Sequence, residues 1–263
     1  MSTPSHTFVI CAYKESPFLE ECIQSLKKQS VRSKIIMSTS TPNAFIGALA
    51  EKYGIPLYIN DGEKGITQDW NFAYSLADTD YVTIAHQDDV YGKRYTETLF
   101  KMTEGIKTPL IFFTDYCEIR EGQTVKSNTL LRIKRFLLLP LRPRFAWKSR
   151  FIRRRVLSMG SSICCPSVAF ARNNLPSPVF LNHFRTDEDW EAWERISRLK
   201  GSFIYCRRPL VRHRIHEGSE TSEAIRETGR SAEDYEMFRK FWPKRIAKLL
   251  VKFYSKSESS NTL

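Results

Sequence analysis

Short apolar runs rich in β-forming residues alternate with stretches of helical periodicity along the first 114 residues. Starting with a strand and alternating, these segments cover residues 7–13, 16–26, 34–38, 42–53, 55–59, 65–77, 81–85, 93–105 and 109–114. This alternation is typical of βαβ units, which build a mainly parallel sheet flanked by helices. The sequence therefore predicts an α/β fold in which ligands bind at the carboxyl ends of the strands.

The rest of the chain is less regular. The elements predicted there are a strand at 162–171, a helix at 187–199 and short strands at 202–206 and 210–214. Apolar residues at helical spacing between Phe238 and Phe253, with Lys and Arg between them, predict a basic amphipathic helix that Pro243 could restart. The polar tail from Ser255 is expected to be disordered.

The positive charge is concentrated in one segment. The 263-residue chain has a net charge of +12, but residues 122–186 contain thirteen Lys and Arg and no Asp or Glu, which leaves −1 for the remainder. A uniformly basic protein would suggest nucleic-acid binding. One basic segment in a neutral body instead indicates a local anionic partner.

Two interpretations of the basic regions stay open. Residues 130–147 and the C-terminal helix both mix leucines and aromatic residues with basic ones. Such a mixture suits anionic headgroups and acyl chains at a membrane surface. The alternative is that the C-terminal helix packs its apolar stripe on the domain and leaves a solvated basic face.

The expected location is the cytoplasm, with peripheral contact at the inner face of the plasma membrane. No apolar run approaches the roughly 20 residues of a membrane span. Residues 1–6 lack the basic and apolar regions of a secretory signal. The six cysteines form no C-x-x-C pair and are expected to be reduced thiols.

Two acidic clusters are candidates for chemistry. Asp88 and Asp89 follow a predicted strand, and paired carboxylates there suit Mg²⁺ or Mn²⁺ bridging to phosphates. Asp187-Glu188-Asp189 opens a predicted helix, where a carboxylate could take a proton from a hydroxyl nucleophile. Both clusters could instead cap helices. His216 is either a further metal ligand or a structural histidine.

Three common catalytic motifs are absent. The sequence has no G-x-x-x-x-G-K-[ST], no G-x-G-x-x-G after the first strand and no G-x-S-x-G. These absences argue against a P-loop NTPase, a dinucleotide-binding fold and an α/β-hydrolase.

Taken together, the motifs resemble those of family 2 glycosyltransferases with the GT-A fold. Cys11–Lys14 and Phe18–Gln29 are similar to the first strand end and helix of that family. Gly65–Asp89 is similar to its "G...a.N.a...a.geYi...D.DD" segment, and Glu188–Arg195 to its "E-D-x-x-L-W-x-R" helix. His213–His216 then resembles its "Y-R-x-H" segment, so that the motifs occur in order between about residues 7 and 220.

The resemblance implies a GT-A, Rossmann-like fold and an inverting transfer that depends on Mn²⁺ or Mg²⁺, with Asp189 as the catalytic base. Tyr13 would pack against the nucleotide base. The residues implied to bind the nucleotide sugar are Cys11, Ala12, Tyr13, Glu15, Thr39, Asn71, Gln87 and Asp88, and those implied to bind the metal are Asp88, Asp89 and His216. The implied domains are a GT-A domain at 1–217 (nucleotide-binding half about 1–116, acceptor half about 117–217 with the basic insertion at 122–160), a helical extension at 218–254 and the tail 255–263.

Two departures from the family pattern concern the donor. His86 stands where the family has its first motif Asp, and Ser38-Thr39 stand where it has an acidic pair that reads the base. A UDP-sugar is the default donor, and a dTDP-sugar is possible because Gln87–Tyr91 resembles the segment of bacterial rhamnosyltransferases.

The implied acceptor is a glycan or a polyprenyl-diphosphate-linked glycan of bacterial surface polysaccharide synthesis. A basic nucleic-acid-binding protein and an inactive GT-A scaffold are the alternatives, although no nucleic-acid partner is expected.

Overall fold

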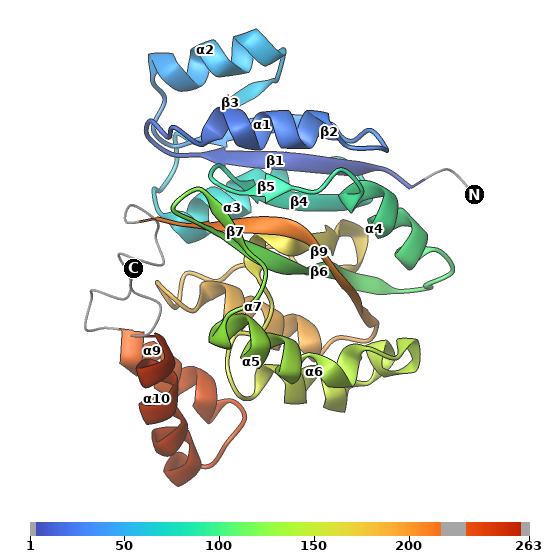
Figure 1. Ribbon diagram of the computed structural model, residues 1–263, viewed down its shortest axis with the longest axis vertical. Coiled ribbons are helices and arrows are strands. Elements are labelled where there is room, and N and C mark those ends of the chain that lie inside the picture. The colour runs from blue at the N-terminus through green and yellow to red at the C-terminus, as the bar shows by residue number, and fades with distance from the viewer. Residues whose placement is uncertain (1–3, 217–229, 259–263) are drawn as a thin grey trace.

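A computed structural model describes residues 4–216 and 230–258 as an α/β structure around one nine-stranded sheet (Figure 1). In chain order the elements are β1 His6–Ala12, α1 Leu19–Lys27, β2 Lys34–Thr39, α2 Ala44–Tyr53, β3 Leu57–Ile59, α3 Ile66–Ser75, β4 Tyr81–His86, β5 Val90–Tyr91, α4 Tyr95–Thr103, β6 Pro109–Arg120, β7 Gln123–Val125, α5 Thr129–Leu137, α6 Arg150–Leu157, β8 Val168–Ala171, α7 Glu188–Ser197, β9 Ser202–Ile215, α9 Arg230–Arg239 and α10 Lys244–Glu258. In Figure 1, α2 lies at the upper end of the sheet beside β3, α1 overlaps β2, and α5, α6 and α7 lie below β6 and β9.

The strand order is β3-β2-β1-β4-β8-β6-β9-β5, and β7 pairs with β6. The pairings among β3, β2, β1 and β4 are all parallel. Beyond β4 only β6 and β9 pair in parallel, because β5, β7 and β8 join antiparallel to their neighbours. The predicted α/β class is confirmed, with a parallel first half and a mixed second half.

The helices in the first half of the chain pack their apolar faces on the sheet, as expected. The central strand β1 is buried along almost its whole length, and α1 covers it with Leu19, Cys22, Ile23 and Leu26. The Asn43 side chain caps α2 by accepting from the Ile46 N–H at 2.9 Å, and Gly54 ends that helix with a left-handed φ of 60°. This packing fixes the strand ends that carry the first sequence motif.

The boundaries in the second half differ from the predictions. The two short strands at 202–206 and 210–214 form one strand, β9, because it pairs along the whole of a longer β6. The strand predicted at 162–171 is reduced to β8, since Cys165–Ser167 form a 3₁₀ turn. Tertiary pairing, which sequence periodicity does not report, decides both outcomes.

The basic insertion is folded and uses part of its charge inside the protein. It forms α5, two 3₁₀ turns at Leu139–Leu141 and Arg144–Lys148, and α6. The Arg153 side chain of α6 is fully buried and donates to the carbonyls of Gly201 and Leu199 at 2.9 and 2.7 Å. Arg153 is therefore structural rather than available to a partner.

The predicted C-terminal helix is two helices, α9 and α10, separated around Pro243. Phe238 of α9 is buried against Trp190 of α7, with ring centroids 5.1 Å apart. Leu249 and Phe253 of α10 remain 54% and 65% exposed, so the apolar stripe is only partly covered. α10 continues to Glu258, past the predicted start of the disordered tail; residues 259–263, like 217–229 of the predicted extension, lie outside the described residues.

Candidate active site

A cleft of about 1280 Å³ opens at the carboxyl ends of β1, β2 and β4 and extends towards α5, α7 and the C-terminal helices. Asp88, which follows β4, and Asp189, in the first turn of α7, both line it. The fold thus brings the two acidic clusters predicted from the sequence to one cavity. Phe238 and Tyr254 also line the cleft, so α9 and α10 contribute to its wall.

The loop after β1 forms the rim of the cleft. Cys11, Ala12, Tyr13 and Glu15, all predicted at the donor, line the cavity there, and the Tyr13 ring is 45% exposed. Lys14 adopts a left-handed φ of 53°, which turns the chain sharply away from the strand. The turn leaves the Tyr13 ring accessible to a flat ligand.

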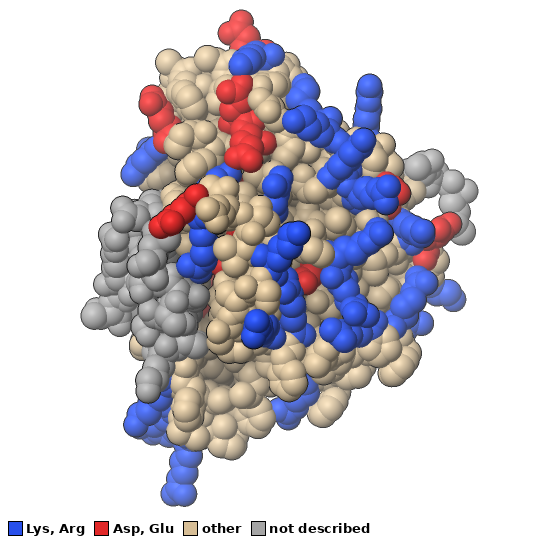
Figure 2. Space-filling model, in the orientation of Figure 1, with Lys and Arg blue, Asp and Glu red and all other residues tan. Residues whose placement is uncertain are grey.

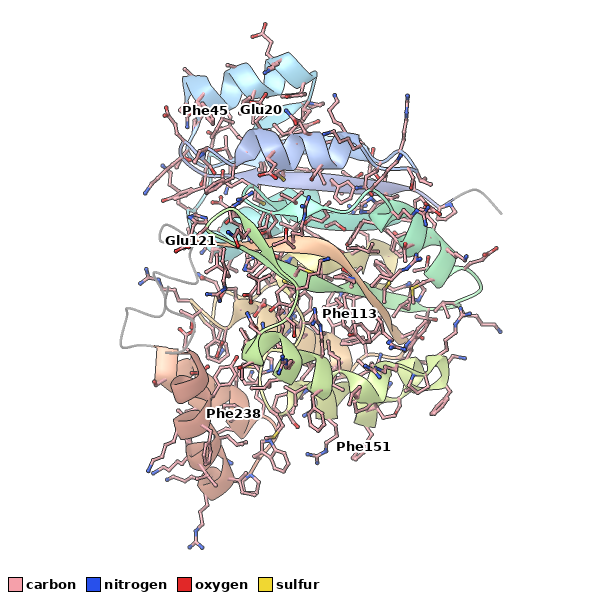
Figure 3. All side chains as sticks on the ribbon, in the orientation of Figure 1. Glu20, Phe45, Phe113, Glu121, Phe151 and Phe238 are labelled. Atoms are coloured by element: carbon pink, nitrogen blue, oxygen red, sulfur yellow. The ribbon has the colours of Figure 1, made fainter. Side chains whose placement is uncertain are left out.

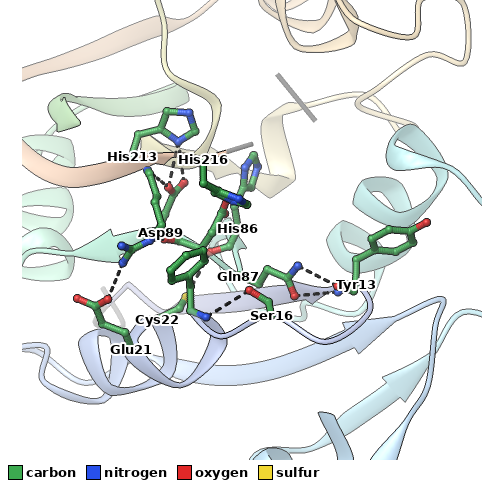
Figure 4. Close-up of polar contacts among 12 residues, drawn as sticks. Tyr13, Ser16, Glu21, Cys22, His86, Gln87, Asp89, His213 and His216 are labelled. Carbon is green, nitrogen blue, oxygen red and sulfur yellow. Dashed lines mark hydrogen bonds and ion pairs between the residues drawn. The ribbon is translucent and has the colours of Figure 1, made fainter. Parts of the chain in front are cut away.

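Gln87 fixes that loop to the end of β4. Its amide nitrogen donates to the Tyr13 carbonyl at 2.9 Å, and its oxygen accepts from the Tyr13 N–H at 2.9 Å (Figure 4). Thr39 also lines the cleft, but its hydroxyl accepts from the Thr41 N–H at 3.0 Å. Gln87 and Thr39, which are both predicted to bind the nucleotide sugar, therefore line the cavity and also hold its loops in place.

The adjacent carboxylates of Asp88 and Asp89 have different surroundings. Asp88 lines the cleft, and its carboxylate lies 3.0 Å from His216 Nε2. Burial alone would raise the pKa of Asp88, but the His216 hydrogen bond and the nearby His213 and His86 lower it below its ordinary value. Asp88 is therefore an ionised carboxylate facing the cavity.

Asp89 is fully buried and is not among the residues that line the cleft. Its carboxylate accepts from the Arg214 N–H at 2.9 Å and lies 3.0 Å from His213 Nδ1 (Figure 4). The pKa of His213 is raised: burial opposes its charge, but the Asp89 carboxylate outweighs burial. Asp89 thus joins the β4–β5 turn to β9, a structural role that the sequence did not predict.

His86 is a candidate metal ligand that the predicted ligand set did not include. Ligand atoms of His86, Asp88 and Asp89 lie within 4.8 Å of one another. His86 Nε2 is buried without a hydrogen-bond partner in the described structure, and burial lowers the pKa of this imidazole, which keeps it neutral. A neutral imidazole beside carboxylates fits a divalent cation such as Mn²⁺. The signal was present in the sequence, since His86 occupies the position of a motif Asp.

Lys134 is a second residue that the sequence interpretation missed. It lies on α5 inside the basic insertion, lines the cleft, and its Nζ is 5.5 Å from the Tyr116 ring centroid. Burial opposes its charge, but Tyr116, Cys164 and Asp189 raise the pKa of Lys134 above its ordinary value. A protonated lysine therefore faces the same part of the cleft as Asp189.

Asn71 is also predicted to bind the nucleotide sugar, but the structure places it outside the cleft. It is not among the cleft-lining residues, and its amide nitrogen donates to the Phe180 carbonyl at 2.8 Å. Its oxygen accepts from the Phe180 N–H at 3.1 Å. Asn71 therefore ties α3 to the segment before α7, and the prediction that it contacts the donor is not supported by its position.

A family comparison identifies the chain. The sequence model of "Glycosyl transferase family 2" matches residues 7–175, so the chain belongs to this family, and the family resemblance is confirmed. A comparison with curated protein sequences finds no match.

Solved GT-A structures share the fold at low sequence identity. TarS 1–349 from S. aureus in complex with UDP-GlcNAc is 13% identical, with a TM-score of 0.63 over 98% of this chain and 73% of that chain. The mannosyltransferase PcManGT from Pyrobaculum calidifontis, in complex with GDP-Man and Mn²⁺, is 13% identical, with a TM-score of 0.61 over 99% of this chain and 74% of that chain. A longer TarS structure is 11% identical, with a TM-score of 0.59 over 94% of this chain; the chain covers only 42% of it.

Proposed function

We propose that this protein transfers a sugar from a nucleotide sugar to a hydroxyl group of a glycan or lipid-linked glycan, with inversion at the anomeric carbon. The observation that carries the proposal is that Asp88 and Asp189, from distant parts of the chain, line one cleft. The two carboxylates have complementary tasks: one faces the donor diphosphate and the other faces the acceptor.

On the acceptor side, Asp189 takes the proton of the attacking hydroxyl as its oxygen bonds to the anomeric carbon. The bond from that carbon to the diphosphate oxygen breaks, and its electron pair leaves with the nucleoside diphosphate. Attack from the face opposite the leaving group inverts the configuration. Lys134, which faces the same region, keeps positive charge beside the developing negative charge.

On the donor side, Asp88 and His86 would hold a Mn²⁺ or Mg²⁺ ion, with the other two predicted ligands beside them: Asp89 has a ligand atom within 4.8 Å of theirs, and His216 lies 3.0 Å from Asp88. Such an ion neutralises charge on the leaving diphosphate when it is bound. Tyr13 offers an exposed ring for the nucleotide base, which Gln87 keeps in place. A UDP-sugar remains the default donor and a dTDP-sugar the alternative, with a hexose or rhamnose as the transferred sugar.

Exposed aromatic residues of the basic insertion support a second part of the proposal, which is contact with a membrane. Phe136, Phe145 and Phe151 of the basic insertion are 69%, 80% and 70% exposed among basic side chains. Aromatic and cationic residues together suit an anionic membrane surface. We therefore propose peripheral association with the cytoplasmic membrane face, near a polyprenyl-diphosphate-linked acceptor of bacterial polysaccharide synthesis. No helix in the described residues is long and apolar enough to span a bilayer.

A panel of sugar nucleotides, each with and without Mn²⁺, tests the proposal by thermal shift and by product formation. A true donor should raise the melting temperature of the wild type only with the metal. Asp88→Asn should lose this metal-dependent shift, whereas Asp189→Asn should keep it and lose transfer by a factor of about 10² to 10⁴. Full transfer by Asp189→Asn would contradict the assignment, and duplex binding without any donor shift would favour the nucleic-acid alternative.

A further inference from the structure

A second pocket, of about 910 Å³, lies on the other side of the strands that border the cleft. Its walls come from β6, the β6–β7 hairpin, α5 and β9, together with the turn that follows α5. We refer to it as the basic pocket. It contains none of the residues assigned above to transfer.

Strand geometry separates the basic pocket from the cleft. Successive side chains of a strand point to opposite faces of the sheet. On β6, Tyr116 lines the cleft whereas Asp115 and Cys117 line the basic pocket, and on β9 His213 lines the cleft whereas Arg212 lines the basic pocket. A ligand in the basic pocket is therefore separated from the donor site by the sheet itself.

The charge of the basic pocket is one-sided. The cations that line it are Lys126, Arg135, Arg142, Arg207 and Arg212. Its only lining acid, Asp115, lies 2.7 Å from Arg135 Nε and is neutralised there. The other four cations are exposed and have no ion pair within residues 4–216 and 230–258. Figure 2 shows Lys and Arg gathered in the middle of the face over β6, β7 and β9.

Tyr205 adds a hydroxyl-bearing side chain to the lining of the pocket. Tyr205 is 4% exposed and its ring stacks on Phe113 with centroids 5.1 Å apart. Tyr205 lines the pocket, and its hydroxyl is not among the buried polar atoms that lack a hydrogen-bond partner in the described part of the chain. Burial raises the pKa of Tyr205, so the hydroxyl keeps its proton. A protonated hydroxyl beside these arginines could donate a further hydrogen bond to a bound anion.

We propose that the basic pocket binds a ligand carrying two or more phosphate groups. Arginine presents paired N–H donors that match phosphate oxygens, and Arg142, Arg207 and Arg212 border one cavity. Clustered, unpaired cations repel one another, and a polyanion relieves this repulsion. The phosphate groups belong either to a soluble diphosphate or to lipid headgroups. The inference does not depend on the proposed transfer reaction.

Calorimetric titration of the whole protein with inorganic pyrophosphate tests the proposal. A chelator removes divalent ions, so that metal-dependent binding in the cleft does not contribute. The double variant Arg207→Ala/Arg212→Ala should bind pyrophosphate at least about tenfold more weakly than the wild type. Arg208→Ala is the matched control, because Arg208 is an exposed neighbour of the same charge that does not line the pocket.

Vesicles of phosphatidylcholine with phosphatidic acid distinguish the two sources of phosphate. Loss of vesicle binding in the double variant would assign the phosphates to lipid, and loss of pyrophosphate binding alone would assign them to a soluble ligand. Equal binding by wild type and double variant to both probes would overturn the proposal. An equal loss in Arg208→Ala would also overturn it, since diffuse surface charge would then suffice.

Discussion

The same residue type has different functions in this protein according to its surroundings. Asp88 and Asp89 are neighbours in the sequence, but Asp88 faces the cleft while Asp89 is buried against β9. Similarly, Arg153 is buried and structural whereas Arg207 is exposed in the basic pocket. Roles must therefore be assigned side chain by side chain, from contacts and exposure.

His6 predicts a pH dependence of stability. Its ring nitrogens lie 2.9 Å from Ser33 Oγ and 3.0 Å from Thr83 Oγ1, and burial lowers the pKa of His6 to about 3. The unfolded chain therefore binds a proton as pH falls below about 6.5, while the folded chain does not. The free energy of unfolding should fall by about 2 kcal/mol between about pH 7 and about pH 5 from this group.

Urea denaturation across this pH range measures the effect. His6→Gln should flatten the pH dependence, whereas His183→Gln, which removes a histidine with a 55% exposed side chain, should preserve it. An unchanged slope in His6→Gln would contradict the assignment.

Asn71→Ala should destabilise the protein without weakening donor binding. The variant removes both hydrogen bonds to the Phe180 backbone and leaves those groups without their partner, at a cost of about 1–3 kcal/mol. Chemical denaturation gives the stability and thermal shift the donor binding. Asn174→Ala is the control, since its single bond to the Pro109 carbonyl is exposed and should cost less. A loss of donor affinity at full stability would restore Asn71 to the donor site.

At the scale of elements, α9 holds the loop that leads into α7. Glu233 of α9 accepts from the backbone N–H groups of Arg185 and Thr186 at 3.0 and 2.8 Å. Burial opposes its charge, but these bonds and that of the Thr186 hydroxyl lower the pKa of Glu233. The carboxylate thus fixes the chain just before Asp189 from a helix distant in sequence.

Glu233→Ala should lower the turnover of the proposed transfer about tenfold with little change in donor binding, because it loosens the entry to α7. Steady-state kinetics with separate kcat and KM measures this. Glu236→Ala on the same helix is the matched control, since the Glu236 side chain is 58% exposed and lies 3.8 Å from His183. Equal turnover in both variants would show that the loop holds its position without Glu233.

At the scale of the whole molecule, one end carries the exposed aromatic residues of the basic insertion. Phe151 lies at the lower edge in Figure 3, and Phe45 of α2 lies at the opposite edge. The proposed membrane face therefore lies away from α2. The donor cleft lies between the first half of the sheet and the helices at this end.

Vesicle flotation tests the proposed membrane face. The double variant Phe145→Ser/Phe151→Ser should bind anionic vesicles about tenfold or more weakly, because each buried phenyl ring contributes about 1.5–3 kcal/mol. Ile59→Ser is the control, because Ile59 is 46% exposed on β3, outside the basic insertion. If the wild type ignores anionic vesicles at moderate salt, membrane contact is excluded.

Much of the fold and part of the candidate active site could be predicted from the sequence. Alternating periodicity predicted β1, β2, β3, β4 and the first half of β6, together with the helices between them, because the hydrophobic faces of β1, β2 and β4 repeat locally. The motif positions predicted that Tyr13, Gln87, Asp88 and Asp189 belong to one site, and all four line the cleft. The strands and helices depend on residues close together in the chain, whereas the shared site was predicted from the resemblance to the family.

By itself, then, the sequence determined the α/β class, the family and the two acidic clusters. Tertiary structure alone decided that β6 and β9 pair over their full length, that Asp89 and Asn71 turn inward, and that Lys134 faces Asp189. It also decided which basic residues are free to bind an anion. The physical reason is that burial, pairing and pKa depend on neighbours brought together from distant segments, and local periodicity contains no information about those neighbours.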